Sequence, residues 1–480
     1  MRGVVWFSVL LFVVSGVCAF GEEPPLPEGL GDTQEESAEP ALPEGLGGEE
    51  DGGEEPALPE GLGGGEQDEA AAETAEEEDK PGWRERIPLD LHGFWETRAG
   101  TRTQQDPAYS KWGSIGETRL QLETEKAWDK AIFEFTGDLY TDAVTEEVCG
   151  DLRQARLTLR VGERFDIRAG RQVLTWGTGD QLFINDTFPK DWQAFFIGRD
   201  TEYLKAPSDA VKAGFYSDAV NIEFVFTPQF AHDRFIRGER VSYYQPMFNT
   251  FWGDDHWVDY NAPNEWFEDD EFNLRIYKRI GGNEFALYGY SGYWKSPGGQ
   301  RLVPFMQASF PKLNVYGASF RGMLGKGVFN AEVGYYDSRQ DRDGGNLLIN
   351  NSEFRVLLGY ERELAKNFTA GAQWYLEHMM DYNEYMRTRL PWIPARDQDR
   401  HVFTLRLTKL AMNQNLTLSW FMYYSPTDGD AYMRPNVHYK ITDAWAAEIG
   451  GNIFMGESDS SFFGQFKHNT NVYVGVRYGF

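Results

Sequence analysis

Cysteines, clustered positive charge and long apolar runs are nearly absent from this chain of 480 residues. It has 2 cysteines, and loss of the leader described below would leave Cys149 alone, which excludes an internal disulfide in the mature chain. No segment after the leader offers the ~18 consecutive apolar residues that a membrane-spanning helix needs, so a bundle of such helices is excluded. The 46 Lys and Arg residues face 75 Asp and Glu residues. This imbalance argues against nucleic acid as a partner, because phosphate binding needs clustered cations.

Signatures of catalysis and metal binding are lacking as well. None of the 7 histidines stands in a metal-binding spacing such as H-E-x-x-H. Neither a G-x-S-x-G elbow nor a phosphate-binding loop occurs in the sequence. The sequence therefore predicts no enzyme, no cofactor and no metal site.

Aromatic residues, in contrast, are abundant. They make up 15% of the chain, and almost all of them lie from Trp83 onward. A soluble domain rarely needs so many, whereas a membrane wall with aromatic girdles at both interfaces does. The aromatic content therefore favours a membrane protein that crosses the bilayer without helices.

Residues 1–19 have the pattern of a secretory signal peptide. Arg2 supplies positive charge, the stretch from Val4 to Val14 is almost wholly apolar, and Val17 and Ala19 provide the small residues of a cleavage site. The apolar stretch is too short for a stable membrane span. The pattern predicts export of the chain.

Residues 20–82 form a strongly acidic repeat. Between Glu22 and Lys80 there are 22 acidic residues and one basic residue. A unit of the type Pro-Ala-Leu-Pro-Glu-Gly-Leu-Gly occurs three times with a period of 16 residues. So short a unit cannot bury a core, so we expect a disordered, extended linker in the periplasm. It is either a solvated spacer or a set of docking motifs whose avidity recruits a periplasmic partner. The apolar anchors of such motifs would be Leu26, Leu30, Leu42, Leu46, Leu58 and Leu62.

Residues 83–480 show strand periodicity. In the stretch 401–409, Phe403, Leu405 and Leu407 alternate with Thr404 and Arg406, and several other segments repeat this alternation. One face then suits hydrocarbon and the other suits water, as in a barrel with lipid outside and an aqueous lumen inside. The sequence predicts an all-β fold, a transmembrane antiparallel β-barrel.

The connections between these segments alternate between short and long. Short turns are expected near residues 128, 162, 217, 281, 325, 365, 412 and 442, with longer loops between them. Eight turns and nine loops connect 18 strands, within a range of 16–18. The sheet must close, because an open edge in lipid leaves backbone groups unpaired at several kcal/mol each.

Phe480 is a terminal aromatic residue, Tyr478 is a second one, and Gly475 precedes them. These final residues resemble the C-terminal signal of bacterial outer-membrane barrels. The resemblance implies recognition by the barrel-assembly machinery and insertion into outer-membrane lipid.

A second resemblance lies in the middle of the chain. A Gly-Arg-Gln…Trp-Gly…Asp segment resembles one in uncharacterised outer-membrane barrels near the alginate-export group, and implies a single-chain channel of about 18 strands without an assigned substrate. Physically, a strand ends here and a long loop begins, with Gly177 and Gly179 allowing a turn and Arg171 able to pair with Asp180. The motif either fixes the loop or lines the pore. Its residues are Gly170, Arg171, Gln172, Trp176, Gly177 and Asp180.

Charged residues on the inward face are the candidates for lining a pore. They could create a transverse field that favours anions, or they could neutralise one another across neighbouring strands. A loop at residues 231–269 with ten Phe, Trp and Tyr residues either narrows the pore or forms an external cap. The predicted pore-lining residues are Arg119, Glu123, Glu134, Asp138, Arg156, Arg160, Arg168, Arg275 and Arg406.

These observations favour an outer-membrane channel, similar to a porin, that passes polar solutes through a water-filled lumen. The alternative is an export duct of a trans-envelope assembly, recruited through the N-terminal repeats. A non-conducting structural barrel is a third possibility, and it predicts no conductance in planar bilayers.

Overall fold

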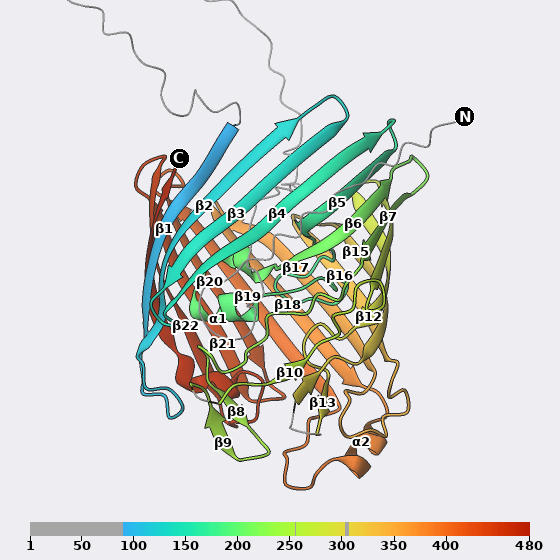
Figure 1. Cartoon of the computed structure of the whole chain (residues 1–480), viewed down its shortest axis with the longest axis vertical. Helices are drawn as coiled ribbons and strands as arrows, with labels where there is room; N and C mark the ends of the chain where they lie inside the picture. The colour runs from blue at the N-terminus through green and yellow to red at the C-terminus, as the bar shows by residue number, and fades with distance from the viewer. Residues whose placement is uncertain (1–89, 255, 303–306) are drawn as a thin grey trace, which may run out of the picture. The chain divides into compact units, whose positions relative to one another are not determined.

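The computed structural model describes residues 90–254, 256–302 and 307–480. The predicted signal peptide, the acidic linker with its docking leucines and the first residues of the predicted barrel domain lie outside the described residues. The rest forms mainly β-structure (Figure 1).

Eighteen strands form one antiparallel sheet. β1 pairs with β2 along one edge and with the last strand, β23, along the other, where Phe94 lies opposite Gly479. The sheet is thus a closed barrel, as predicted. The barrel strands are β1 (Asp90–Arg102), β2 (Gly113–Ala127), β3 (Ala131–Asp142), β4 (Glu147–Val161), β5 (Phe165–Val173), β6 (Pro207–Phe215), β7 (Asn221–Thr227), β11 (Glu271–Ile280), β12 (Asn283–Tyr293), β15 (Lys312–Leu324), β16 (Gly327–Ser338), β17 (Glu353–Ala365), β18 (Phe368–Met379), β19 (Asp399–Ala411), β20 (Leu416–Ser425), β21 (Asp430–Lys440), β22 (Trp445–Gly456) and β23 (Asn471–Gly479).

The eight predicted turns lie at one end of the barrel, at the top of Figure 1, and the other connections, most of them longer, lie at the opposite end. All eight predicted short turns are present. In the turn between β11 and β12, Gly281 and Gly282 have φ values of 55° and 78°, a left-handed conformation that glycine adopts without steric cost. We call the two ends the turn end and the loop end.

The long connections carry all the remaining elements. No helix in the described ranges is both long and apolar enough to cross a bilayer. The elements outside the barrel wall are α1 (Trp192–Ile197), η2 (Thr201–Leu204), β8 (Tyr243–Gln245), β9 (Thr250–Trp252), β10 (Tyr260–Asn261), β13 (Gly299–Arg301), β14 (Gln307–Ser309), α2 (Tyr382–Thr388) and η3 (Gly464–Asn469).

The outer face of the wall is apolar and the inner face carries the charge. On β4, Leu157 and Leu159 are 39% and 40% exposed, while Arg156 and Thr158, which alternate with them, are 6% and 7% exposed. This is the reverse of a soluble sheet, in which water-facing positions are polar. It is the distribution expected where the outer face meets lipid.

The lumen is not wholly aqueous, which differs from the prediction. An apolar core fills part of its loop half, where the residues 174–206 between β5 and β6 enter the barrel. Phe195 and Phe196 of this segment pack against Tyr432 and Phe454 of the wall. Strict alternation of apolar and polar residues therefore ends where the wall contacts protein instead of water.

The outward position of Leu405 on β19 gives a test of which face meets lipid. We expect Leu405→Arg to destabilise the barrel in lipid bilayers by about 2–4 kcal/mol, because the guanidinium would lie in hydrocarbon. The same substitution at Thr408, which lies on the inner face, should cost much less. Urea titration of both variants in vesicles measures the difference. Equal costs would contradict the assignment of the faces.

Candidate permeation path

The connection between β5 and β6, residues 174–206, lies inside the barrel, and we call it the interior segment. In Figure 1 its helix α1 lies within the ring of strands. The segment contacts the wall on opposite sides, because Arg199 binds Glu117 of β2 and Asn185 binds Glu332 of β16, half-way round the ring of strands. Any solute that crosses the barrel must pass this segment.

The Gly-Arg-Gln…Trp-Gly…Asp motif forms the entry of the interior segment. Trp176 is buried against Phe188 and Tyr288, with ring centroids 5.1 and 6.2 Å away. Gly177 has a φ of 88°, so its predicted role in the turn is correct. Gly179 does not have a positive φ, but a side chain there would collide with the carbonyl oxygen of Leu182.

Two other motif residues, Gly170 and Gln172, lie in strand β5 of the barrel wall and contact the neighbouring strands. A Cβ on Gly170 would lie 2.2 Å from the carbonyl oxygen of Ala155 on β4, so β4 and β5 could not pair with this register if a larger residue stood there. Gln172 is fully buried, and its amide donates a 3.0 Å hydrogen bond to the carbonyl of Ala210. These two residues thus join β5 to both of its neighbours.

Glu332 on β16 anchors the entry of the interior segment. Its carboxylate is buried and accepts hydrogen bonds from the backbone N–H groups of Thr178, of Gly179 at 2.8 Å and of Asn185 at 3.2 Å. The side-chain amide of Asn185 donates another at 2.9 Å. Hydrogen bonds to an ionised group are stronger than neutral ones, so Glu332 holds two parts of the segment at once. The sequence pattern does not identify this residue as part of the site.

The predicted pairing of Arg171 with Asp180 is wrong. Arg171 forms a two-pronged ion pair with Asp209, its register partner on β6, with both distances 3.0 Å. Asp180 instead pairs with Arg406 of β19 across the lumen, at 2.5 and 2.6 Å. The chain turns at Gly177 and carries Asp180 away from β5, which separates the two.

The middle of the interior segment is the short helix α1. The Asp191 side chain caps its first turn through a 2.7 Å bond from the N–H of Ala194, and Gly198 ends it with a φ of 94°. A side chain at Gly198 would collide with Tyr473 of β23. The C-terminal end of the helix therefore packs directly against β23 of the wall.

The last part of the interior segment returns along β1 to β4. Arg199 donates to Glu117 of β2 at 2.6 and 3.0 Å. The ring of Tyr203 lies between two guanidiniums, those of Arg119 at 4.4 Å and Arg153 at 4.6 Å. Arg153 stands at a bulge in β4, where the alternation shifts by one residue, so it shares the inner face with Arg156 despite its odd number.

The nine predicted pore-lining residues all stand on the inner face of their strands. Their role as pore lining stays a prediction, but many of them pair with one another or with neighbouring wall carboxylates. Arg156 binds Glu134 through two 2.6 Å bonds, and Arg119 pairs with Asp138. These contacts match the alternative of neutralisation across strands. Arg275 pairs with Glu223 at 3.3 Å and with Glu284 at 2.6 Å, Arg168 pairs with Asp166 at 3.3 Å, and Arg406 pairs with Asp180. Glu123 and Arg160 lie nearer the turn end of their strands.

The aromatic-rich loop at residues 231–269 lies partly inside the lumen and partly at the end of the barrel, so each of the two predicted positions holds for one part of it. Val241 and Tyr243 belong to the apolar core of the lumen, and Arg234 pairs with Asp191 of the interior segment at 3.1 Å. The hairpin of β8 and β9 lies at the loop end of the barrel (Figure 1). The loop therefore covers the interior segment with one part and projects with another.

A cavity of about 550 Å³ lies between the interior segment and strands β12 to β20 at the loop end. Aromatic rings and paired charges line it: Arg355 lies 3.9 Å from the centroid of the Tyr336 ring, and Arg400 lies 4.6 Å from that of Phe462. Burial lowers the pKa of Lys295 in the adjoining loop, and the carboxylate of Glu271 opposes this shift. The cavity thus lies on the loop-end side of the interior segment, and the positive and negative charges that line it nearly balance.

The predicted assembly residues lie at the closure of the barrel. Phe480 and Gly93 exchange backbone hydrogen bonds of 3.0 and 3.2 Å. The Tyr478 ring packs 4.9 Å from that of Trp445 on the outer face, and Gly475 stands on the inner face near Arg98. Their recognition by the assembly machinery stays a prediction. Within the described ranges, no group of three or more His, Cys, Asp or Glu residues could hold a metal ion.

Comparison with known proteins finds similarity in structure only. No protein family matches the sequence, and no curated protein matches it. The structure is similar to Pseudomonas aeruginosa OccD3 (OpdP), with a TM-score of 0.46 at 11% identity over 82% of this chain and 91% of that one. It is also similar to a triple mutant of the Rhodopseudomonas blastica porin, with a TM-score of 0.36 at 11% identity over 82% of this chain and 100% of that one.

Proposed function

We propose that this chain is an outer-membrane channel, similar to a porin, that passes small polar solutes down their concentration gradient. The observation that carries the proposal is the closed barrel with exposed apolar residues outside and charged residues inside. A barrel of this strand number is wide enough for an aqueous channel. The interior segment narrows that channel, so the solutes must be small.

The charged wall supports passage of polar solutes. Arg156 with Glu134 and Lys212 with Glu223, the latter pair 2.9 Å apart, present hydrogen-bonding groups of both signs to the lumen. Such a surface can replace part of the hydration shell of a polar solute. An apolar solute would gain nothing from it.

Planar-bilayer recordings of the purified full-length chain test this proposal. We expect discrete conductance steps, and reversal potentials in salt gradients that report the ion preference. Heat-unfolded protein from the same preparation serves as the control. A folded, inserted barrel that conducts no ions would overturn the channel and favour the structural barrel.

The location and the assembly partner are part of the same proposal. We place the barrel in the outer membrane, with residues 20–82 as a periplasmic tether that a soluble partner could bind, and the last strand as the signal for the assembly machinery. The grouping near the alginate-export barrels also stays a prediction, and we assign no catalytic activity. The export duct depends on the acidic repeats, which lie outside the described residues, and no observation favours it over the passive channel.

A further inference from the structure

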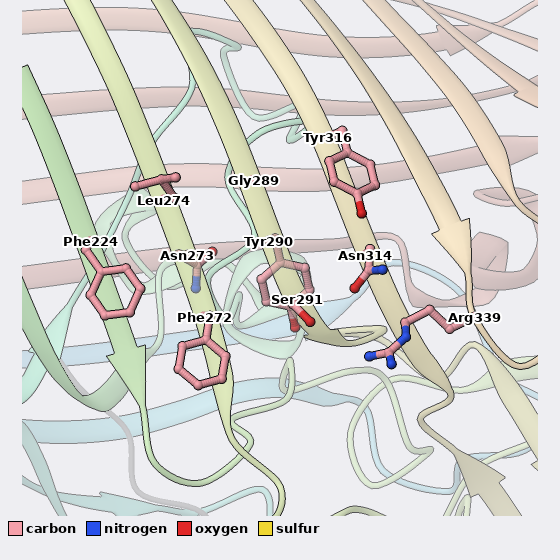
Figure 2. A pocket seen from close by; sticks show the side chains of 10 residues that line it. All are labelled: Phe224, Phe272, Asn273, Leu274, Gly289, Tyr290, Ser291, Asn314, Tyr316 and Arg339. Atoms are coloured by element: carbon pink, nitrogen blue, oxygen red, sulfur yellow. The ribbon is translucent and has the colours of Figure 1, made fainter. Parts of the chain in front are cut away.

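The outer face of the barrel has a groove of about 380 Å³ across β7, β11, β12 and β15. Figure 2 shows Phe224, Phe272 and Leu274 on one side of it and Tyr316 on the other. Between them lies Gly289 of β12. The groove faces away from the lumen, since the neighbouring Tyr290 points inward and is buried.

Two small residues on β12 create the groove. Toward the turn end, the outward residues of this strand are Phe285 and Leu287, which are 48% and 61% exposed. Toward the loop end, they are Gly289 and Ser291. A Cβ added at Gly289 would meet no heavy atom within 4 Å, so the space above this residue is empty of protein.

The groove changes character along its length. Its middle is apolar, because Gly289 lies opposite Leu274 on one side and Tyr316 on the other. One step closer to the loop end, Ser291 lies opposite Asn314. On the β15 side, small polar side chains thus replace apolar ones as the groove approaches the edge of the membrane, while Phe272 lies opposite Ser291 on the β11 side.

A guanidinium stands at the polar end. Arg339 follows β16 directly, and Figure 2 shows its side chain directed toward Ser291 and Asn314. It is exposed and makes no side-chain hydrogen bond or ion pair with any residue in the described ranges. The nearby Arg342, in contrast, is paired with Asp337 at 2.8 Å.

We propose that this groove binds one anionic phospholipid, with an acyl chain over Gly289 and its phosphate headgroup at Arg339 and Asn314. Lipid tails already surround the barrel, so burial of hydrocarbon alone would not select one molecule. Selection comes instead from the fit of the chain between the rings and from the charge-assisted bond of a guanidinium to phosphate. The inference requires that the outer face meets lipid, but it does not require conduction.

Native mass spectrometry of the full-length barrel, incubated with phosphatidylglycerol or phosphatidylcholine, tests the site. We expect one phosphatidylglycerol to be retained in preference to phosphatidylcholine. Gly289→Phe should abolish this retention by filling the groove. Arg339→Gln should weaken it by about tenfold, the effect of losing one strong charged hydrogen bond.

Two variants serve as matched controls. Gly150 on β4 also faces outward, and a Cβ there would likewise meet nothing within 4 Å, so Gly150→Phe adds the same ring elsewhere. Arg164 is an exposed arginine at the turn end, so Arg164→Gln removes the same charge elsewhere. Both should retain the lipid as the unmodified chain does.

Several results would overturn the proposal. They are undiminished retention by Gly289→Phe, equal retention of the two lipids, or a barrel dimer that Gly289→Phe dissociates, which would assign the groove to a second copy. If Gly289→Phe fails to fold, Gly289→Leu is judged by the same criteria. A failure of the channel proposal would leave conductance absent while the lipid is still retained, so the two proposals fail separately.

Discussion

Replacing residues 176–204 with a short Gly-Ser turn is expected to raise the single-channel conductance several-fold. Val173 at the end of β5 and Pro207 at the start of β6 are register partners. The two strand ends are therefore adjacent, and a hairpin turn of about 2–5 residues can join them. The wall should stay closed, because no barrel strand is removed.

The reason for the increase is the position of the interior segment. It binds Glu117 on β2 through Arg199 and Glu332 on β16 through Asn185, so it lies across the lumen. Shortening only the tip of the β8–β9 hairpin, residues 246–249 at the loop end, is the control and should leave the conductance nearly unchanged. Heat-dependent gel mobility would show whether each variant forms a folded barrel.

A point substitution tests the same idea with less disruption. Glu332→Ala removes the acceptor of four hydrogen bonds from the interior segment. Each hydrogen bond to a charged group contributes about 1.5–3 kcal/mol, and each 1.4 kcal/mol is a tenfold change in population. We expect the occupancy of a high-conductance state to rise at least about tenfold.

The matched control for this variant is Glu361→Ala. Glu361 lies on the neighbouring strand β17, also on the inner face, but it makes no hydrogen bond to the interior segment within the described ranges. Its removal should leave the open-state distribution as it is. The idea is contradicted if Glu332→Ala and the chain without residues 176–204 both fold and conduct like the unmodified chain. The interior segment would then not limit the current.

The barrel could be predicted from the sequence because its signals are local. The alternation around Phe403 and Arg406 reports one strand, and the glycine pair at Gly281 and Gly282 reports one turn. Each of these depends on residues that are neighbours in sequence. Closure then follows from the cost of unpaired backbone groups in lipid. Strand number and the assignment of faces therefore needed no long-range information.

The contents of the lumen could not be predicted in this way, because they depend on contacts between distant residues. Asp180 and Arg406 are 226 positions apart, and nothing in either local pattern selects the partner. Arg171 pairs instead with Asp209, a partner that only the register of β5 and β6 defines. One signal was available: the run from Phe183 to Phe196 is rich in aromatic residues, which a solvated loop does not need.

The large aromatic residues on the inner face of the wall also depend on contacts with distant parts of the chain. Tyr423 and Tyr432 occupy lumen positions that alternation assigns to water. They are buried because the interior segment covers them: the Tyr423 hydroxyl donates to the carbonyl of Gln181 at 2.6 Å, and the Tyr432 ring contacts Phe195. A large ring on the inner face of a predicted barrel strand thus indicates a segment packed inside the lumen.

Glu117→Ala is expected to destabilise the folded barrel by about 3–5 kcal/mol, the cost of breaking a buried ion pair on one side. Glu117 is 4% exposed and lies among three guanidiniums. Its carboxylate accepts from Arg199 at 2.6 Å, from Arg119 at 3.2 Å and from Arg240 at 3.4 Å. These belong to the interior segment, the wall and the loop that covers the segment, so one residue joins three parts of the molecule.

Without this carboxylate, Asp138 remains beside Arg119 and Asp142 beside Arg240, but Arg199 loses its strongest partner. The like charges then repel one another in a site from which water is largely excluded. We expect the interior segment to leave the wall at Arg199, so that trypsin cleaves there in folded Glu117→Ala but not in the unmodified chain. Urea titration in vesicles measures the loss of stability.

A double-mutant cycle separates the ion pair from a general packing defect. If the loss of the Glu117–Arg199 pair carries most of the cost, then Glu117→Ala combined with Arg199→Ala should cost clearly less than the sum of the two single substitutions. Glu125→Ala, on the same strand and face but exposed at the turn end, is the control and should change stability by less than about 0.5 kcal/mol. Additive costs, or a loss for Glu117→Ala no larger than that of the control, would mean that the three guanidiniums are held apart and hydrated without Glu117. The interior segment would then be retained by its other contacts, such as those with Glu332 and Arg406, and by the apolar core.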